Sequence, residues 1–352
     1  MCGVVVIGAH RSHNPSMHRY TDLLARSYEA LGYQVKIVRP PAALSRRAPR
    51  RLRKWVGYVE KYLLFPLRLQ RLDRDAIIHV ADHSDAPYIT FLRSRDRTIV
   101  TCHDLIAVRA AVGELPEHQT RGTGRALQKW ILSSLSRAGT IISVSQSTAS
   151  DLVRLVGRPG DAVLPNPLDD RFLEHSVTPG DPNQALIVST VGWRKRRDLA
   201  VRAWCELNQR SPRSLDLVVI GPSLTAEERG IILAAGYATS QVRTVQDVSD
   251  ERLLQEYRSS RLLIQTSKYE GFCWPILEAN SQGVVALCAD EPILRETGAG
   301  NVFFDPTATD TDFNAVMKAA DDQTLASRLQ ERARMFSEER FREALSNIIR
   351  NA

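Results

Sequence analysis

Short apolar runs that alternate with amphipathic stretches limit what this chain can fold into more than any other feature. The clearest runs lie at residues 2–8, 76–81, 98–102, 140–144, 186–192, 217–220, 262–264 and 284–287. Between them lie stretches such as 17–31, where apolar residues recur at helical spacing. A continuous apolar run suits a strand that is buried on both faces. The alternation therefore predicts parallel sheets that carry helices on both faces.

The length of 352 residues suggests two domains, each large enough to bury its own core. The polar stretch 174–184, which contains two prolines and a glycine, is expected to link them. We therefore expect an α/β chain of two doubly wound, Rossmann-like domains facing across a cleft. They should comprise residues 1–174 and about 175–337, with ligands at the carboxyl ends of the strands.

The number and spacing of the cysteines indicate the redox state of the cellular compartment. The cysteines are odd in number, scattered and without metal-type spacing, which indicates free thiols in a reducing compartment. They are Cys2, Cys102, Cys205, Cys273 and Cys288. No stretch approaches the ~20 apolar residues of a membrane span, and the run at 1–7 is too short and lacks the basic flank of a secretion signal. We expect a cytoplasmic protein.

The net charge of +7 is concentrated in two basic runs, at 46–54 and 194–197. Both can meet anions. The first run opens a basic and aromatic stretch, residues 46–65, with two readings. It can be a helix that packs an apolar stripe on the sheet, or a surface that lies on an anionic membrane. No motif supports nucleic-acid binding, so we expect no nucleic-acid partner.

The stretch from Leu262 to Ala279 has the pattern strand, loop, helix, and Pro275 suits the first helical position. A helix N-terminus offers free N–H groups and a positive dipole end, which suit a phosphate. Glu270 and Glu278 flank this end. On one continuous helix, side chains eight residues apart would diverge by roughly 80°. With Glu270 in the loop and Glu278 one turn inside the helix, the two carboxylates can converge on sugar hydroxyls.

Together with Tyr269, Gly271 and Phe272, these residues resemble the Glu-x7-Glu signature of the retaining, nucleotide-sugar-dependent glycosyltransferases of family 4, which have the GT-B fold. The resemblance implies that Glu270 holds hydroxyls of the donor sugar and that Glu278 holds the nucleotide ribose. It also places Gly271 and Phe272 in the donor-binding loop.

The same loop departs from the family at two positions. The family usually reads Glu-Gly-Phe-Gly-Leu-Pro, whereas here Cys273 and Trp274 replace Gly and Leu. If the family's glycine only offers a backbone N–H to the donor, Cys273 can do the same. If it supplies a positive φ or room for the sugar, donor choice can differ.

Two further segments carry the resemblance. Gly192, followed by Arg194 and Lys195, resembles the family's passage of strand, glycine, basic pair and helix. It implies that Arg194 and Lys195 neutralise the donor diphosphate, Arg as a two-pronged donor and Lys as a point charge. His103-Asp104, after the strand at 98–102, resembles the family's His-Asp, whose His lies against the donor sugar. From the residues alone, His103 is equally a hydrogen-bonded core histidine and Asp104 a helix cap.

The resemblance implies a retaining glycosyltransferase. It would move a hexose from a nucleotide diphosphate sugar to a hydroxyl of a saccharide or lipid-linked saccharide, in cell-surface polysaccharide or glycoconjugate assembly. Retention in the family is ascribed to same-face attack, with the departing phosphate oxygen accepting the acceptor's proton. The family's last helix crosses back onto the first domain, which implies the same for residues 338–352.

No cofactor other than the donor and no metal is expected. Asp73-Arg-Asp75 superficially matches the Asp-x-Asp of metal-dependent transferases, but it precedes a strand, at the end of the sheet away from the ligand edge. Asp310-Thr-Asp312 is expected to begin a helix.

Three other functions stay open. One is a nucleotide-sugar epimerase of the same architecture. Another is a non-catalytic basic protein that binds nucleic acid or membrane through residues 46–54. The third is a peripheral version of the transferase, bound to the inner face of the membrane through residues 46–65. The base, the sugar and the acceptor cannot be read from the sequence.

Overall fold

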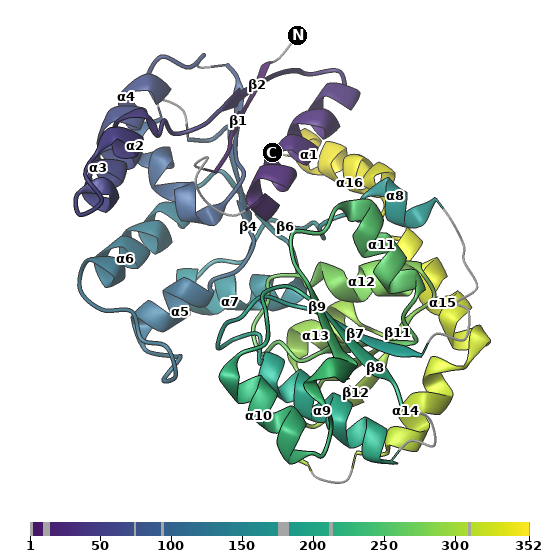
Figure 1. Ribbon diagram of the computed structural model, residues 1–352. Coiled ribbons are helices and arrows are strands. Elements are labelled where there is room, and N and C mark those ends of the chain that lie inside the picture. The colour runs from purple at the N-terminus through teal and green to yellow at the C-terminus, as the bar shows by residue number, and fades with distance from the viewer. Residues whose placement is uncertain are drawn as a thin grey trace. The chain divides into compact units, whose positions relative to one another are not determined.

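The computed structural model describes residues 3–9, 15–73, 75–92, 95–174, 183–210, 214–308 and 311–351, apart from the side chains of residues 15, 54 and 351. The chain forms two compact units, one of residues 1–165 and 341–352 and the other of residues 166–340. Each unit is built on its own six-stranded sheet, flanked by helices (Figure 1). The expected pair of doubly wound α/β domains is confirmed.

The first sheet has the strand order β2-β1-β3-β4-β5-β6, and every neighbouring pair is parallel. Its strands are β1 (Gly3–Ile7), β2 (Gln34–Val38), β3 (Ile77–Val80), β4 (Thr98–Cys102), β5 (Thr140–Ser143) and β6 (Ala162–Val163). The order reverses direction between β1 and β3. Such a switch point opens a crevice at the carboxyl ends of the two strands, where ligands bind in sheets of this type.

The helical elements of the first unit lie mostly between these strands. They are α1 (Pro15–Ala30), α2 (Ala43–Arg47), α3 (Arg53–Val59), the π-helical turn η1 (Glu60–Leu64), α4 (Phe65–Leu69), the 3-10 segment η2 (His83–Phe91), α5 (Ile106–Val112), α6 (Thr123–Leu135) and α7 (Gln146–Val156). The last helix, α16 (Glu338–Asn351), joins this unit from Phe341 onward.

The second sheet has the order β12-β11-β10-β7-β8-β9, again with parallel neighbours throughout. Its strands are β7 (Gln184–Val188), β8 (Asp216–Ile220), β9 (Val242–Val245), β10 (Leu262–Gln265), β11 (Val285–Ala289) and β12 (Val302–Phe304). Counted from β7, this is the strand order of the dinucleotide-binding Rossmann fold, and its switch point lies between β7 and β10.

The second unit also has a full set of flanking helices. They are α8 (Asp170–Leu173), α9 (Arg197–Arg210), α10 (Ala226–Ala234), the 3-10 turn η3 (Thr239–Gln241), α11 (Asp250–Arg258), α12 (Trp274–Ser281), α13 (Pro292–Thr297), α14 (Phe313–Ala320) and α15 (Gln323–Arg334).

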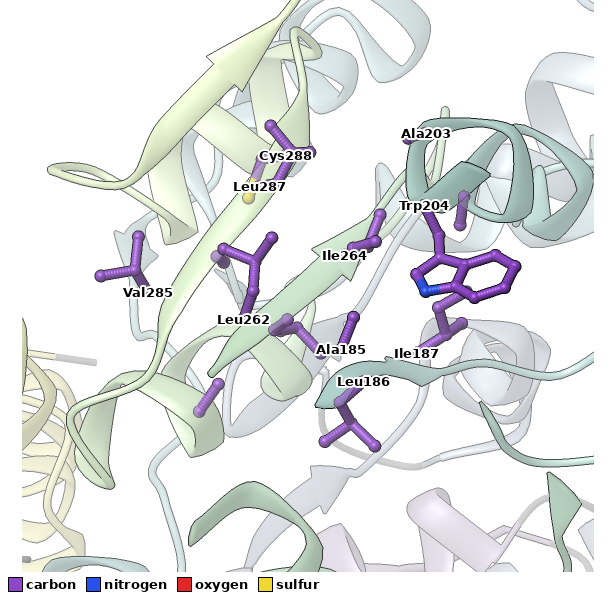
Figure 2. Close-up of a cluster of buried hydrophobic side chains, with 14 of the residues drawn as sticks. Ala185, Leu186, Ile187, Ala203, Trp204, Leu262, Ile264, Val285, Leu287 and Cys288 are labelled. Atoms are coloured by element: carbon purple, nitrogen blue, oxygen red, sulfur yellow. The ribbon is translucent and has the colours of Figure 1, made fainter. Parts of the chain in front are cut away.

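The apolar runs form the cores, as their continuous pattern predicts. All residues of β4, β5, β10 and β11 are buried. In the second unit, side chains from β7, β10 and β11 gather with Trp204 of α9 in one cluster (Figure 2). The Trp204 indole N–H donates to the Leu215 carbonyl at 2.8 Å, so its one polar atom is paired inside the core.

The chain returns to the first unit at its end. Phe341 and Leu345 of α16 are buried with Val4, Val6 and Tyr20 in the core of that unit. The expectation that the last helix crosses back is confirmed.

The division between the units falls after Pro165 rather than after residue 174. Phe172 of α8 explains the difference, because its ring is buried in the second core and its carbonyl accepts a 2.7 Å hydrogen bond from Gln282. Most of the expected linker, residues 175–182, lies outside the described residues.

The basic stretch 46–65 packs on the core only in part. Phe65 is buried, but Trp55, Val59 and Leu63 are exposed, so the expected apolar stripe does not as a whole cover the sheet. Within the described residues, no helix has the length and apolar character needed to cross a membrane.

Candidate active site

Two loops meet at the switch point of the second sheet. One follows β7 (residues 189–196) and the other follows β10 (residues 266–273). They lie side by side because β7 and β10 are parallel neighbours, so their carboxyl ends share one edge. Hydrogen bonds join the loops: the Lys268 N–H donates to the Arg194 carbonyl at 2.8 Å, and the Thr266 hydroxyl donates to the Arg196 carbonyl at 2.8 Å.

Glu270 is held between two cations at this junction. Its carboxylate accepts a 2.8 Å bond from Arg194 Nη1 and forms an ion pair with the ammonium of Lys195. The Glu270 side chain is 9% exposed, against 36% for Arg194 and 20% for Lys195. Burial alone would raise the pKa of Glu270, but Lys195 and Arg194 outweigh it and hold the pKa below its ordinary value. The carboxylate is therefore ionised at neutral pH.

Glu278 lies on α12, in its second turn, and is oriented by a tyrosine. The Tyr257 hydroxyl of α11 donates to Glu278 Oε2 at 2.7 Å. Tyr257 is fully buried, and that burial raises its pKa well above the ordinary value, so it remains a donor. Tyr257 is a functional residue that the sequence motifs did not single out. The signal for its role was available, since a buried tyrosine hydroxyl needs a hydrogen-bond partner.

Cys273 occupies a left-handed backbone conformation, with φ +73° and ψ 66°, directly before α12. A residue with a Cβ rarely adopts this region, whereas glycine enters it freely. Of the two roles considered for the family's glycine, the structure therefore supports the positive φ. The Cys273 side chain is buried, and burial raises the pKa of its thiol well above the ordinary value, which keeps it protonated.

Aromatic side chains fix the start of α12. The helix begins at Trp274, so Pro275 takes its second position rather than the first; the proline still costs no hydrogen bond, because the first four N–H groups of a helix have no partner within it. The Trp274 indole donates to the Pro167 carbonyl at 3.0 Å. Phe272 is buried, and its ring lies 6.2 Å from Trp274 and 5.8 Å from Phe336. Gly271 precedes it and is half-buried.

The loop after β7 leaves open space at Gly192. Gly192 is exposed, and a Cβ built on it would meet no described atom within 4 Å. Further along, Trp193 lies 5.6 Å from the ring of Tyr269 on the other loop.

The four cations of residues 194–197 divide into two pairs. Only Arg194 and Lys195 reach Glu270. Arg196 pairs with Glu291 at 2.7 Å, while the buried Arg197 forms a two-pronged pair with Glu228 of α10 at 2.6 and 2.7 Å. The sequence indicated that this run can meet anions, with Arg194 and Lys195 as the candidates for the donor diphosphate, whereas Arg196 and Arg197 pair with carboxylates of the chain itself.

His103 belongs to the first unit, at the carboxyl end of β4, while the other predicted site residues lie together in the second. Its Nε2–H donates to the Ala81 carbonyl at 3.0 Å, and its ring meets Tyr20 edge-on at 4.5 Å. Burial lowers the pKa of His103, so the ring is neutral at pH 7 and Nδ1 is its acceptor nitrogen. Asp104 accepts the Ile106 N–H at 3.0 Å, but the N-cap of α5 is Leu105 and has no side-chain capping bond, so the capping role considered for Asp104 is wrong.

The two Asp-x-Asp passages have local roles. Asp73 accepts the Asp75 N–H at 3.1 Å, before β3, as expected from its place in the sequence. Asp312 caps α14, while residue 310 lies outside the described residues. Among the side chains that the structure describes, no group of three or more His, Cys, Asp or Glu is arranged to hold a metal ion.

Two family models match the chain in adjoining parts. The model of Glycosyltransferase Family 4 matches residues 17–172, and that of Glycosyl transferases group 1 matches residues 169–336. Among curated proteins, the O-antigen chain mannosyltransferase B of Escherichia coli is 25% identical over 291 residues, covering 78% of this chain and 74% of that protein.

Solved structures share the fold over the whole chain. Sucrose-phosphate synthase from Thermosynechococcus elongatus superposes with a TM-score of 0.73 at 17% identity, covering 100% of this chain and 99% of that one. Anabaena Alr3699/HepE in complex with UDP and glucose gives 0.72 at 16% identity, covering 99% and 100%. At these identities the likeness concerns the fold alone.

Proposed function

This chain belongs to the glycosyltransferases of the family-4 type with the GT-B fold, and we propose that it moves a hexose from a nucleoside diphosphate sugar to a saccharide hydroxyl. The product would be a cell-surface polysaccharide, because the curated relative acts on an O-antigen chain. That relative is named a mannosyltransferase, which makes mannose the first sugar to test. Alr3699/HepE was solved with UDP, which makes a uridine donor one candidate. The base cannot be read from this sequence, so guanosine donors belong in the test as well.

The observation that carries the proposal is the cluster of Glu270, Arg194 and Lys195. One carboxylate between two cations leaves a net charge of +1, at the strand edge where parallel sheets bind ligands. Both cations are more exposed than the carboxylate, so they can turn from Glu270 to an incoming diphosphate. Glu270 then becomes an acceptor for hydroxyls of the donor sugar.

The proposed chemistry uses these charges, and its same-face attack is what the resemblance to the family implies. The bond between the anomeric carbon and the diphosphate oxygen breaks, and its electron pair leaves with the diphosphate. The acceptor oxygen bonds to the same face of the anomeric carbon, and its proton passes to the departing phosphate oxygen, which retains the configuration. Arg194 and Lys195 stabilise the negative charge that builds on the leaving group. We propose that they supply the positive charge for which other transferases use a metal ion.

Glu278 and His103 complete the proposal. Tyr257 holds the Glu278 carboxylate in one orientation, which suits an acceptor for the two ribose hydroxyls. His103 is neutral, with Nδ1 available as an acceptor, which suits the sugar-binding role that the resemblance implies for it.

A thermal-shift panel tests the donor directly. We expect the unfolding temperature to rise with one nucleoside diphosphate and with its hexose derivative, since a ligand that binds only the folded state stabilises by about 2.7 kcal/mol at 100 times its Kd. The nucleoside monophosphate should shift it less, because it lacks the second phosphate. Lys195→Gln should reduce the diphosphate response and leave the monophosphate response nearly unchanged. A panel with no response to any uridine or guanosine diphosphate would contradict the proposal.

A further inference from the structure

The first unit has a cavity of its own, of about 820 Å³. It is lined by Ala9, just after β1, and by Asp82, just after β3. These two strands form the switch point of the first sheet, so the cavity lies where a doubly wound sheet binds its ligand. The donor cluster described above belongs to the other unit and does not account for it.

Cations outnumber carboxylates around this cavity. Lys61 pairs with the buried Asp85 at 2.7 Å, so these two charges cancel. Asp82 accepts the Ser84 N–H at 2.8 Å. Three guanidinium groups also line the cavity, and none of them forms an ion pair with another residue that the structure describes. These are Arg46, Arg50 and Arg53. The cavity is therefore suited to an anion, and guanidinium groups favour phosphate.

Part of the cavity wall is apolar. Five large side chains from α1, α3, η1 and α6 contribute to it, namely Met17, Tyr58, Tyr62, Leu127 and Ile131. A ligand that fills the cavity would thus meet cations on one part of its surface and apolar groups on another. An amphiphile that carries phosphate has this combination, whereas free phosphate does not.

An exposed apolar row lies on the helical run that lines the cavity. Residues 53–69 form one continuous run through α3, η1 and α4. Trp55, Val59, Leu63 and Leu67 follow one another at four-residue steps and are 45–63% exposed. Four residues make slightly more than one turn of an α-helix and slightly less than one turn of the wider π-helix. The rotation of the row around the axis in the α-helical parts is therefore partly reversed in the π-helical turn. The row therefore stays on one side of the run.

Within residues 43–72, no exposed acid accompanies the arginines beside this row. From residue 43 to residue 72 the only carboxylate is Glu60, which is buried and accepts the N–H groups of Leu44 and Ser45 at 2.6 and 2.8 Å. The exposed arginines of the same stretch are Arg46, Arg47, Arg50, Arg51, Arg53, Arg68 and Arg71. An apolar row bordered by uncompensated cations suits the interface of an anionic bilayer.

We propose that this cavity binds the phosphate-bearing head of a membrane-anchored saccharide, which is the acceptor of the transfer. The arginines hold the phosphate, the apolar wall holds the first part of the lipid, and the exposed row lies on the bilayer that supplies it. This inference rests on the proposed transferase function. It names the class of acceptor, a lipid-linked phosphosaccharide rather than a free glycan.

Titration of the full chain with farnesyl diphosphate tests the cavity. We expect binding to weaken roughly tenfold or more in the double variant Arg46→Gln, Arg50→Gln, which loses two charged contacts. The variant Arg47→Gln, Arg51→Gln is the matched control, because it removes the same charge from the same run at residues that do not line the cavity. Inorganic diphosphate and farnesol should each bind more weakly than farnesyl diphosphate.

Equal losses in the two double variants, or unchanged binding in the first, would overturn the proposal. Inorganic diphosphate bound as tightly as farnesyl diphosphate would overturn its lipid part. The donor function is tested separately. The thermal response to nucleoside diphosphates should survive in Arg46→Gln, Arg50→Gln, because these residues do not belong to the donor cluster.

Vesicle co-sedimentation tests the exposed row. The full chain should bind vesicles of phosphatidylglycerol and phosphatidylcholine, and bind phosphatidylcholine alone weakly. The variant Leu63→Ser, Leu67→Ser should lower that partition roughly tenfold, because two apolar side chains no longer enter the interface. Leu233→Ser, Met335→Ser, which changes two residues of the second unit that are 61% and 52% exposed, should leave it unchanged. Equal loss in both variants would contradict the assignment of the row.

Discussion

Glu270→Gln is expected to lower kcat/KM for hexose transfer by about 100-fold or more, while the protein still folds. The amide keeps the size of the carboxylate but loses its charge. It can neither accept strong hydrogen bonds from sugar hydroxyls nor balance Arg194 and Lys195 before the donor arrives. Losing one preorganised polar group at a reacting centre commonly costs 100-fold to 1,000-fold, or roughly 3–4 kcal/mol of transition-state stabilisation.

The stability of Glu270→Gln should change little by comparison. Arg194 and Lys195 are 36% and 20% exposed, so water still solvates them when the carboxylate is gone. The carboxylate also no longer has to be desolvated in the folded state, which offsets part of the lost pairing. Chemical denaturation of the variant should therefore give a free energy of unfolding within about 1–2 kcal/mol of the wild type.

Glu256→Gln is the matched control. Glu256 is buried and also lies between two cations, Arg243 at 2.8 Å and Arg252 at 2.6 Å. Because Arg243 and Arg252 are 46% and 50% exposed, this variant should also change stability little, but it should keep transfer, whereas Glu270→Gln should lose it. Wild-type turnover by Glu270→Gln, or equal loss of transfer in both, would show that Glu270 has no special part in the reaction.

The sequence was enough to predict the frame of this site. The runs at 262–264 and 185–188 are apolar throughout, as expected for strands in the interior of a parallel sheet, and polar residues that follow such a run lie at the ligand edge. Glu270, Arg194 and Lys195 were therefore candidates before any contact was known. That they touch depends on β7 and β10 being neighbours, although β8 and β9 lie between them in the chain. Local patterns do not contain this order.

Other features depended on tertiary contacts or on torsion angles. Cys273 gives no sign in the sequence of its positive φ, and only the resemblance raised the question. The first-unit cavity combines Ala9, Arg46, Asp82 and Leu127 from four separate segments. The sequence of residues 46–65 showed the charge and the apolar residues of this stretch, but not that Trp55, Val59 and Leu63 would be exposed.

Substitutions in residues 194–197 are expected to give the second large effect. Replacing Arg197 should lower stability and spare activity, whereas replacing Lys195 should lower activity and spare stability. Arg197→Gln is expected to lower the free energy of unfolding by about 3–5 kcal/mol, the usual cost of breaking a buried ion pair from one side. The Arg197 side chain is 2% exposed, and it also donates to the carbonyls of Pro222 and Ser223 at 2.8 and 3.0 Å. Its loss leaves Glu228 charged and buried without its partner. Lys195→Gln should change stability by about 1 kcal/mol at most, since Arg194 still pairs with Glu270.

The transfer activity of the two variants should show the opposite order from their stability. Arg197→Gln, assayed well below its lowered unfolding temperature, should keep transfer close to wild type, whereas Lys195→Gln should lose about 100-fold. Urea denaturation and kcat/KM, measured on both variants, check the two halves of this prediction. Lost transfer in a folded Arg197→Gln would mean that Arg197 acts in transfer together with Arg194 and Lys195, which would contradict this prediction.

The stability difference between wild type and Arg197→Gln should depend on pH in a direction that can be measured. Burial alone would raise the pKa of Glu228, but its bonds with Arg197 and Thr225 outweigh burial and lower the pKa. A carboxyl with a lowered folded pKa adds stability above its unfolded pKa and loses it as the pH falls through the folded one. The stability gap between wild type and Arg197→Gln should therefore be full at neutral pH and shrink in acid. A gap that stayed constant with pH would mean that Arg197 stabilises the fold through its carbonyl contacts and packing rather than through the charge of Glu228.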